Sequence, residues 1–549
     1  MKKLTIYVLL FSLIAFSPVQ LVAQDEDDLG NETVNVIKAF EPTLRDSKKI
    51  GDVPSGDTST AKVPTLSYDI QPNGIVPAFN ITPIKAFKLK ENTISKLYNG
   101  YVKAGYGTRN SPLAEVYYNN KRSKDKDIGV YLKHYSAGGK VKDRGKTNNS
   151  KNVVNVFANK YFDDTELNAD VLYNRDVVRY YGFNSNNFDY TKKETKHRFN
   201  DINATVGFKS NHTKEERLSY HTKLGFTLFE DNRDAKENLF NVQFGAARNF
   251  DIHRFGLNAD LDFVKVSFDN DDANRNVLRF DPYYEIKRDL LELHAGLNFT
   301  AAKTNNSKAY VYPDVQVLFS IIRNKLVFRA HGKGYLKDNT LKSVSQENPF
   351  MIDSMVLNNS SVPLELRGTL SGTIAKNIQV NGTAAIITEK DALFFLNQPI
   401  SLDFPQTFRP IYDDLTTINL GAEVNVNTTK KIGGGASLNV YSYSADNLDK
   451  ALHKPNLKMT VFAHYKLQDK IELKTDWFLR SGMFAFDYVE QKPEKIDGWL
   501  DANFNIQYNY SKILSVFLQL NNVTASRYEY WYNYPTYRFH ALAGLSYSF

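Results

Sequence analysis

Long stretches in which apolar and polar residues alternate dominate the chain from about residue 97 to residue 549. In one such stretch the apolar residues are Leu500, Ala502, Phe504, Ile506, Tyr508 and Tyr510, and the polar residues between them are Asp501, Asn503, Asn505, Gln507 and Asn509. Because successive side chains of a strand point to opposite faces, this period of two indicates β-strands with one apolar and one wet face. Patterns typical of amphipathic helices are almost absent, and the chain is predicted to be all-β.

The length of these stretches separates two kinds of all-β protein. They run for about 10 to 16 residues, whereas strands of soluble proteins have about 5 to 6 and a strand that crosses a membrane needs about 9 to 11. The 36 Phe and 33 Tyr suit a chain in which every second strand residue faces lipid. Residues 97–549 are therefore predicted to form an antiparallel transmembrane β-barrel.

Short and long connections alternate strictly in the predicted barrel. Tight turns are expected at 163–164, 251–254, 288–289, 323–324, 376–377, 428–431, 468–470 and 511–512, and long loops at 138–150, 181–197, 338–362, 397–410 and 526–536. In outer-membrane barrels short turns face the periplasm and long loops face outside, and the strand number is even. The scheme predicts about 22 strands. Their starts are expected near Leu97, Pro112, Asp127, Lys151, Thr165, Arg198, Glu216, Lys236, Ile252, Arg275, Asp289, Lys308, Lys325, Leu364, Ile378, Pro410, Ile432, Lys458, Ile471, Glu494, Ile513 and Tyr534.

The first residues have the pattern of an export signal. Lys2 and Lys3 precede an apolar stretch from Leu4 to Phe16, and Ala23 stands before a polar, acidic run. This order is typical of a secretory signal peptide, with cleavage expected near Ala23. The apolar stretch is too short for a membrane helix, which needs about 20 residues. We therefore expect export to the cell outer membrane.

Between the signal and the barrel, residues 24–96 are polar and broken by prolines. We expect an extended segment that lies in the periplasm or fills the barrel lumen. The chain has no cysteine, which excludes a lipid-carrying cysteine and disulfides. The predicted organisation is thus a signal peptide at 1–23, an extended segment at 24–96 and a barrel at 97–549.

The C-terminal residues resemble those of a known family. The chain ends in LSVFLQLNNVTASRYEYWYNYPTYRFHALAGLSYSF, with an Asn-rich strand end, an aromatic loop and a terminal aromatic residue. This ending resembles the closing hairpin of TonB-dependent receptors, whose transporter barrels have 22 strands. The resemblance implies that Phe549 and Tyr547 belong to the signal read by the outer-membrane insertion machinery.

A second resemblance lies near the predicted mature N-terminus. Residues 32–40 read ETVNVIKAF, and Glu32, Thr33, Val34, Asn35 and Val36 resemble a TonB box. In such receptors this segment adds a strand to a TonB-type energy-coupling protein. An ordinary valine-rich extended stretch is the alternative. The segment 41–96 is too short for the family's complete plug domain, so the chain resembles barrels of this type that lack a full plug.

The candidate chemical sites in the sequence all have simpler interpretations. No hydrolase or metalloprotease motif is present, and His294 and His331 fall on polar faces of different strands without a close partner in sequence, so neither an enzyme, a cofactor nor a metal is expected. The net charge of +8 is too small to indicate nucleic acid. The basic stretch at 139–147 is interpreted as a surface loop that can touch lipopolysaccharide. The tyrosines and tryptophan at 528–537 are interpreted as an interfacial girdle, with sugar stacking as the alternative.

Two functions from different classes remain open. The first is a barrel similar to TonB-dependent receptors that admits or transports a solute across the outer membrane, with residues 24–96 in its lumen. The second is a non-transporting structural or adaptor subunit of an envelope complex for secretion or assembly. The TonB-box-like segment favours the first function, and the missing plug favours the second.

Overall fold

The computed structural model describes residues 97–549, apart from 121–122, 212–215, 270, 305–306, 402–404 and 427–430. The predicted signal peptide, the segment 24–96 and the TonB-box-like residues lie outside this part. The described residues belong to one compact unit, Glu91–Phe549. In the described part, no helix has the length and apolar character needed to cross a membrane.

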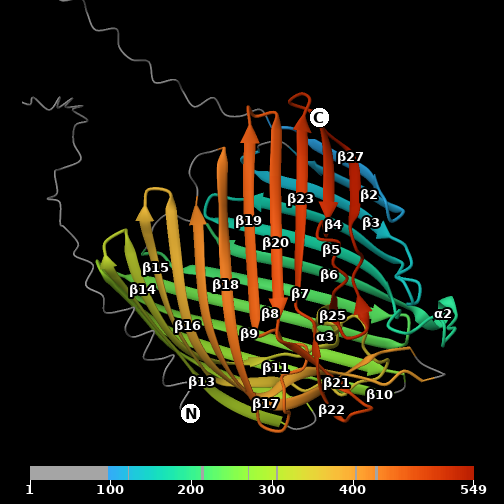
Figure 1. The fold of residues 1–549 in the computed structure, drawn as a ribbon. Coiled ribbons are helices and arrows are strands. Elements are labelled where there is room, and N and C mark those ends of the chain that lie inside the picture. The colour runs from blue at the N-terminus through green and yellow to red at the C-terminus, as the bar shows by residue number, and fades with distance from the viewer. Residues whose placement is uncertain are drawn as a thin grey trace, which may run out of the picture. The chain divides into compact units, whose positions relative to one another are not determined.

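The unit is built on one antiparallel sheet that closes on itself (Figure 1). The strands of this sheet are β1 (Gly100–Gly107), β2 (Ser111–Asn119), β3 (Lys126–Ala137), β4 (Asn149–Tyr161), β5 (Thr165–Arg179), β6 (Lys196–Ser210), β7 (Ser219–Asp231), β8 (Ala235–Phe250), β9 (His253–Phe268), β10 (Asp271–Asn274), β11 (Asn276–Arg288), β12 (Leu291–Lys303), β13 (Ser307–Ile322), β14 (Leu326–Lys337), β15 (Ser360–Ala375), β16 (Ile378–Asn397), β17 (Phe408–Val426), β18 (Ile432–Ala445), β19 (Leu457–Leu467), β20 (Ile471–Ser481), β23 (Trp499–Asn509), β24 (Leu514–Asn521) and β27 (His540–Ser548).

Each strand pairs with the next along the chain, and β27 pairs with β1 to close the barrel. β10 and β11 both pair with β9 and are separated only by Arg275, so they form one barrel strand. The described residues therefore form a closed barrel of 22 strands. This confirms the fold class and the strand number expected from the alternation and from the family resemblance.

Small elements lie in the connections at one end of the barrel. They are α2 (Lys192–Thr195), α3 (Leu341–Glu347), the hairpin of β21 (Met483–Asp487) with β22 (Lys492–Ile496), and the hairpin of β25 (Glu529–Trp531) with β26 (Tyr534–Pro535). Two predicted strand starts are wrong for this reason. Glu494 lies in β22 and Tyr534 in β26, whereas the barrel strands begin at Trp499 and His540. Both extended segments pair locally, which the alternation pattern alone does not distinguish from pairing in the barrel.

The outer wall of the barrel is apolar and the inner wall is polar, as the alternation predicts. On β17, Ile418 and Leu420 are exposed on the outside, while Asn419 between them is buried inside. On β27, Leu545 and Tyr547 are exposed and Ser546 is buried. An exposed apolar band of this kind suits lipid rather than water. The chain therefore has the architecture of an outer-membrane β-barrel.

The two ends of the barrel differ. One end, here called the turn end, carries the start of β1, residue Phe549 and the predicted tight turns. The other, the loop end, carries α2, α3 and both small hairpins (Figure 1). All the predicted long loops lie at the loop end. Strict alternation of length is nevertheless wrong, because the connections 108–110 and 232–234 at the loop end are also short. Antiparallel neighbours can be joined by a hairpin of any length, so topology does not set loop length.

The seam between β27 and β1 is packed closely around glycine. Gly544 pairs with Gly105, and a Cβ on Gly544 would lie 2.1 Å from the carbonyl oxygen of Ala104. In the lumen the buried Phe517 ring covers the same glycine, and the Lys103 ammonium lies 4.4 Å from the centre of that ring. The backbones of the first and last strands can approach here only because no side chain separates them.

We expect Gly544→Val to weaken barrel closure by about 1–3 kcal/mol, because the backbone at the seam must shift to make room. The matched control is Gly382→Val in β16, where an added Cβ would meet nothing within 4 Å. The temperature at which the folded barrel loses its faster mobility on a detergent gel measures the effect. Equal melting temperatures for the two variants would contradict a tight seam.

Candidate functional site

The connection between β14 and β15, residues 338–359 and here called the α3 loop, folds back against the inner wall. Thr340 caps α3 through its side-chain oxygen, which accepts a hydrogen bond from Ser343 N. Across from it the buried carboxylate of Glu237 on β8 accepts a hydrogen bond of 2.6 Å from Leu341 N. A carboxylate at this position satisfies a free backbone donor and faces the positive end of the short helix. The barrel wall itself thus holds the start of α3.

Two ion pairs hold the same region. Lys342 Nζ on α3 lies 2.9 Å from Asp201 Oδ1 on β6. Arg279 on β11 points into the lumen, because Leu278 and Phe280 beside it are exposed on the outer face. Its guanidinium binds Asp338 of the loop and, at 2.9 Å, Asp262 of β9.

Burial raises the pKa of Asp338 above its ordinary value, and Arg279 opposes this shift. Partly desolvated pairs of this kind leave an uncompensated charge if one member is removed. The α3 loop is therefore held against the wall by ion pairs, and the stability of each charge depends on its partner.

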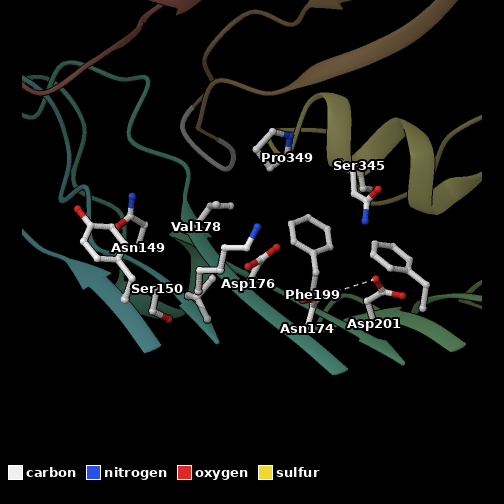
Figure 2. A pocket seen from close by; sticks show the side chains of 14 residues that line it. Asn149, Ser150, Asn174, Asp176, Val178, Phe199, Asp201, Ser345 and Pro349 are labelled. Carbon is white, nitrogen blue, oxygen red and sulfur yellow. Dashed lines mark hydrogen bonds between the residues drawn. The ribbon is translucent and has the colours of Figure 1, made fainter. Parts of the chain in front are cut away.

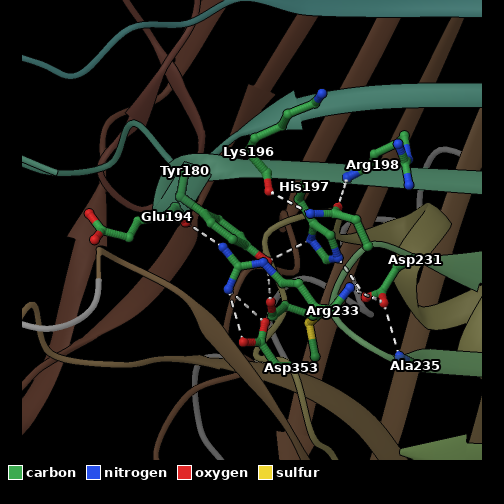
Figure 3. Close-up of polar contacts among 11 residues, drawn as sticks. Tyr180, Glu194, Lys196, His197, Arg198, Asp231, Arg233, Ala235 and Asp353 are labelled. Atoms are coloured by element: carbon green, nitrogen blue, oxygen red, sulfur yellow. Dashed lines mark hydrogen bonds and ion pairs between the residues drawn. The ribbon is translucent and has the colours of Figure 1, made fainter. Parts of the chain in front are cut away.

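The far part of the α3 loop has a second anchor, shown in Figure 3. The Tyr180 hydroxyl lies 2.7 Å from the carbonyl oxygen of Met351 and 2.6 Å from Nδ1 of His197. The Arg233 guanidinium donates two hydrogen bonds of 2.9 Å to the carboxylate of Asp353. Tyr180 follows β5 and Arg233 follows β7. The β5–β6 and β7–β8 connections, which are neighbours at the loop end, therefore both bind the α3 loop.

An apolar cluster, here called the mouth core, joins the α3 loop to other loops at this end. Its members include Phe350, Met351, Phe395, Phe408, Trp531 and Tyr534. The rings of Phe350 and Tyr534 stack with centres 3.7 Å apart, and Phe408 N donates to the Phe350 carbonyl at 2.9 Å. Burial of several aromatic side chains makes this closure stable as well as tight. The described loops therefore pack together over the loop end.

The environment of His453 shows that water is excluded from the mouth core. Its ring lies 5.3 Å from Phe408 and 5.1 Å from Trp531, and burial lowers the pKa of His453 to about 3. Nδ1 donates to the carbonyl oxygen of Phe395 at 3.0 Å, which requires the neutral ring to carry its proton there. The imidazole of His453 is thus uncharged at neutral pH.

A pocket of about 590 Å3 lies between α3 and the wall formed by β3 to β7 (Figure 2). Phe199 and Phe229 supply apolar surface, and Asn149, Asn174 and Gln346 supply amide groups. Lys151 and Asp176, which are opposite one another in the pairing of β4 with β5, supply one charge of each sign. This mixture of apolar surface and convergent polar groups is typical of sites for small solutes.

The structure corrects two interpretations of sequence patterns. The aromatic residues at 528–537 are not an outer girdle, because Trp531 and Tyr534 are buried in the mouth core, and Tyr528 stacks on Trp499 with ring centres 4.1 Å apart. His294 and His331 are not without close partners, since Asp314 on the intervening strand lies 3.6 Å and 2.7 Å from them. In the described part no group of three or more acidic or histidine side chains is arranged to hold a metal.

Tyr547 and Phe549, the residues of the predicted insertion signal, lie on the seam. Tyr547 is exposed on the outer face, and the carbonyl oxygen of Phe549 accepts hydrogen bonds from Asn99 N and Gly100 N. Their role in insertion stays a prediction. Residues of the α3 loop were not singled out from the sequence, where 338–362 is only a long polar connection.

The barrel resembles solved receptors and transporters of the TonB-dependent type. The iron transporter FrpB from Neisseria meningitidis (F3-3 variant) has a TM-score of 0.64 at 10% identity, covering 83% of this chain and 82% of that one. The ferric-catecholate import receptor Fiu from E. coli K12 has a TM-score of 0.62 at 10% identity, covering 83% and 82%. The siderophore receptor PirA from Acinetobacter baumannii has a TM-score of 0.63 at 9% identity, covering 83% and 81%.

No family model and no curated protein matches the sequence. At these identities the likeness shows the fold alone, a 22-stranded receptor-type barrel. It confirms the resemblance stated from the C-terminal residues.

Proposed function

We infer that this protein admits a small polar solute across the outer membrane and that the α3 loop is the barrier at its mouth. The observation that carries the proposal is the packing of this loop inside the wall, held by Glu237, Asp201 and Arg279. A wide barrel leaks unless its lumen is filled. An outward-facing loop tied to the inner wall is a barrier that can be released without unfolding the barrel.

The pocket beside α3 is where such a solute would rest. Its amides, its paired charges and the Phe199 and Phe229 rings suit a polyhydroxylated solute that has one apolar face. Asp201 is neutralised by Lys342, so the pocket carries no large excess of one sign. We therefore favour a sugar-like solute over a strongly charged one.

The N-terminal segment has a part in this proposal. Residues 24–96, after removal of a signal peptide near Ala23, would enter the lumen from the turn end and form a second barrier. Val34 and Val36 in the TonB-box-like stretch would pair with a TonB-type protein and withdraw that barrier. What supports this proposal is that β1, the first described strand, begins at the turn end, and that this end faces the periplasm in outer-membrane barrels.

Solute flux into proteoliposomes tests the proposal. We expect the full chain to pass glucose slowly, and a chain lacking residues 24–96 to pass it several-fold faster, because one of two barriers is gone while the α3 loop remains. Maltoheptaose should stay excluded from both, since the loop still narrows the mouth. Barrels that pass no solute in either form would contradict transport.

An adaptor in an envelope complex is the second candidate, and the mouth core favours it. The mouth core buries aromatic residues from several connections. So much packed aromatic surface opposes the movement that a removable barrier requires. A stable, closed barrel suits a scaffold. Stoichiometric recovery of secretion or barrel-assembly proteins with the detergent-purified protein, together with absence of flux, would establish this function instead.

A further inference from the structure

We propose that His197, Tyr180 and the carbonyl group of Met351 form a proton-operated latch that holds the α3 loop at low pH and loosens it as pH rises. The latch does not depend on transport, because it concerns only how firmly the loop is docked. It lies in the part of the loop between α3 and β15. Figure 3 shows Tyr180 and His197 beside one another.

The protons available along these contacts fix the direction of each hydrogen bond. The Tyr180 hydroxyl is within hydrogen-bond distance of two groups, His197 Nδ1 at 2.6 Å and the Met351 carbonyl oxygen at 2.7 Å. A carbonyl oxygen can only accept, so the single hydroxyl proton of Tyr180 must lie toward Met351. His197 Nδ1 must then donate to the Tyr180 oxygen and carries a proton.

The other nitrogen of the same ring also carries a proton. Nε2 of His197 lies 2.7 Å from Oδ2 of Asp231. The second oxygen of Asp231 already accepts hydrogen bonds from Arg233 N at 2.8 Å and Ala235 N at 3.0 Å, as expected of an ionised carboxylate. All three contacts of the latch are therefore satisfied together only when His197 is the doubly protonated, cationic imidazolium.

Loss of one proton rearranges the chain of hydrogen bonds. The neutral ring keeps its proton on Nε2, where the Asp231 carboxylate needs a donor, and Nδ1 becomes an acceptor. The Tyr180 hydroxyl then turns to Nδ1, and the Met351 carbonyl loses its donor. Met351 and Tyr180 are fully buried, so no water replaces the lost partner. A buried acceptor left without a donor costs enough to shift a local opening equilibrium.

Other charged groups lie near the His197 ring and affect the docking of the loop. Arg233 lies over the Tyr180 ring, 4.8 Å from its centre, and is itself paired with Asp353 of the loop. The Asp231 carboxylate lies beside the other face of the contact, 2.7 Å from Nε2 of His197. Burial raises the pKa of Asp338 at the near end of the loop, which adds pH dependence of the same sign. A test must separate these contributions.

Hydrogen exchange of residues 348–357 in the detergent-solubilised full chain, corrected for the intrinsic rate, provides that test. Between about pH 5 and about pH 8, the range in which histidine commonly titrates, we expect protection to fall about tenfold. Tyr180→Phe removes both hydrogen bonds while keeping the ring, so its protection should be low throughout and nearly independent of pH. His197→Gln, which cannot titrate, should likewise abolish the dependence.

A strand peptide such as 366–374 serves as the internal control and should show no such change. A wild-type loop whose protection does not fall with pH would overturn the latch. So would Tyr180→Phe or His197→Gln chains that keep the full dependence, because Asp338 or Glu237 would then be responsible.

Discussion

Replacing residues 338–359 by Asn-Gly in a chain that lacks residues 24–96 is expected to raise solute flux about tenfold or more, because barrels of only 16 to 18 strands already leave an aqueous channel. Lys337 and Ser360 are paired at the ends of β14 and β15, so a two-residue hairpin turn can join them without strain. The replacement removes α3 and the Phe350 and Met351 contributions to the mouth core. Maltoheptaose, excluded while the loop is present, should now enter proteoliposomes.

The matched control uses the same turn at the exposed tip of another hairpin at the loop end. Asp487 and Lys492 are paired in the β21–β22 hairpin, and residues 488–491 between them can also be replaced by Asn-Gly. Val489 in this tip is 92% exposed, so the change should leave flux as it was. If the α3-loop replacement folds, as judged by gel mobility, and flux stays at the control level, the α3 loop is not the barrier.

Arg279→Met is expected to release the near end of the α3 loop about 100-fold more often, which corresponds to roughly 3 kcal/mol, the low end of the cost of breaking a buried ion pair. The guanidinium is the shared partner of Asp338 and Asp262, and Asp260 lies 4.0 Å away. Without it three carboxylates face one another in a poorly solvated place. Hydrogen exchange of residues 338–347 at neutral pH measures the loss of protection.

The same variant should recover as pH falls. Burial already raises the pKa of Asp338 in the docked loop, and removing Arg279 takes away the group that opposes the shift. A carboxyl whose pKa is higher when docked contributes stability that is complete below its undocked pKa and is lost as pH rises through the docked value. The variant loop should therefore be protected at acidic pH and released at neutral pH, over a window that lies higher than in the wild type.

Arg367→Met is the control for this change. Arg367 on β15 also pairs with a lumen carboxylate, Glu365 at 2.8 Å, but neither residue contacts the α3 loop through a hydrogen bond or ion pair among the described residues. Its removal should leave exchange of residues 338–347 close to the wild-type rate. Similar loss of protection in both variants would mean that general weakening of the wall, and not the Arg279 network, releases the loop.

The turns show which structural features can be predicted from a few neighbouring residues. Of the predicted tight turns, Lys376-Asn377 and Arg323-Asn324 fall between paired strands at the turn end, and strand starts such as Thr165, Ile378, Ile432 and Ile471 coincide with the observed ones. Alternation and turn residues are properties of a few neighbouring residues, so they can be read without knowing the partner strand. At Glu494 and Tyr534 the alternation pattern was misleading, because these segments pair in small hairpins and not in the barrel sheet.

The contacts of the α3 loop and the mouth core could not be predicted from local sequence patterns. Tyr180 and Met351 are 171 residues apart in sequence, Arg144 and Asn533 are 389 apart, and nothing in their local patterns marks them as neighbours. The aromatic residues at 528–537 give the same composition whether they face lipid, a sugar or a protein core. His294 and His331 gained Asp314 as a partner only because β13 lies between their strands.

The sequence alone determined the class of fold, because a period of two over membrane-spanning length allows each strand to satisfy lipid on one face and water on the other, and closure into a barrel leaves no free edge. Tertiary structure decided what occupies the loop end. The α3 loop is held by Glu237, Asp201, Arg279 and Tyr180, which come from separate strands and connections of the wall. Barrel closure brings these groups together around the lumen, so their arrangement exists only in the folded chain.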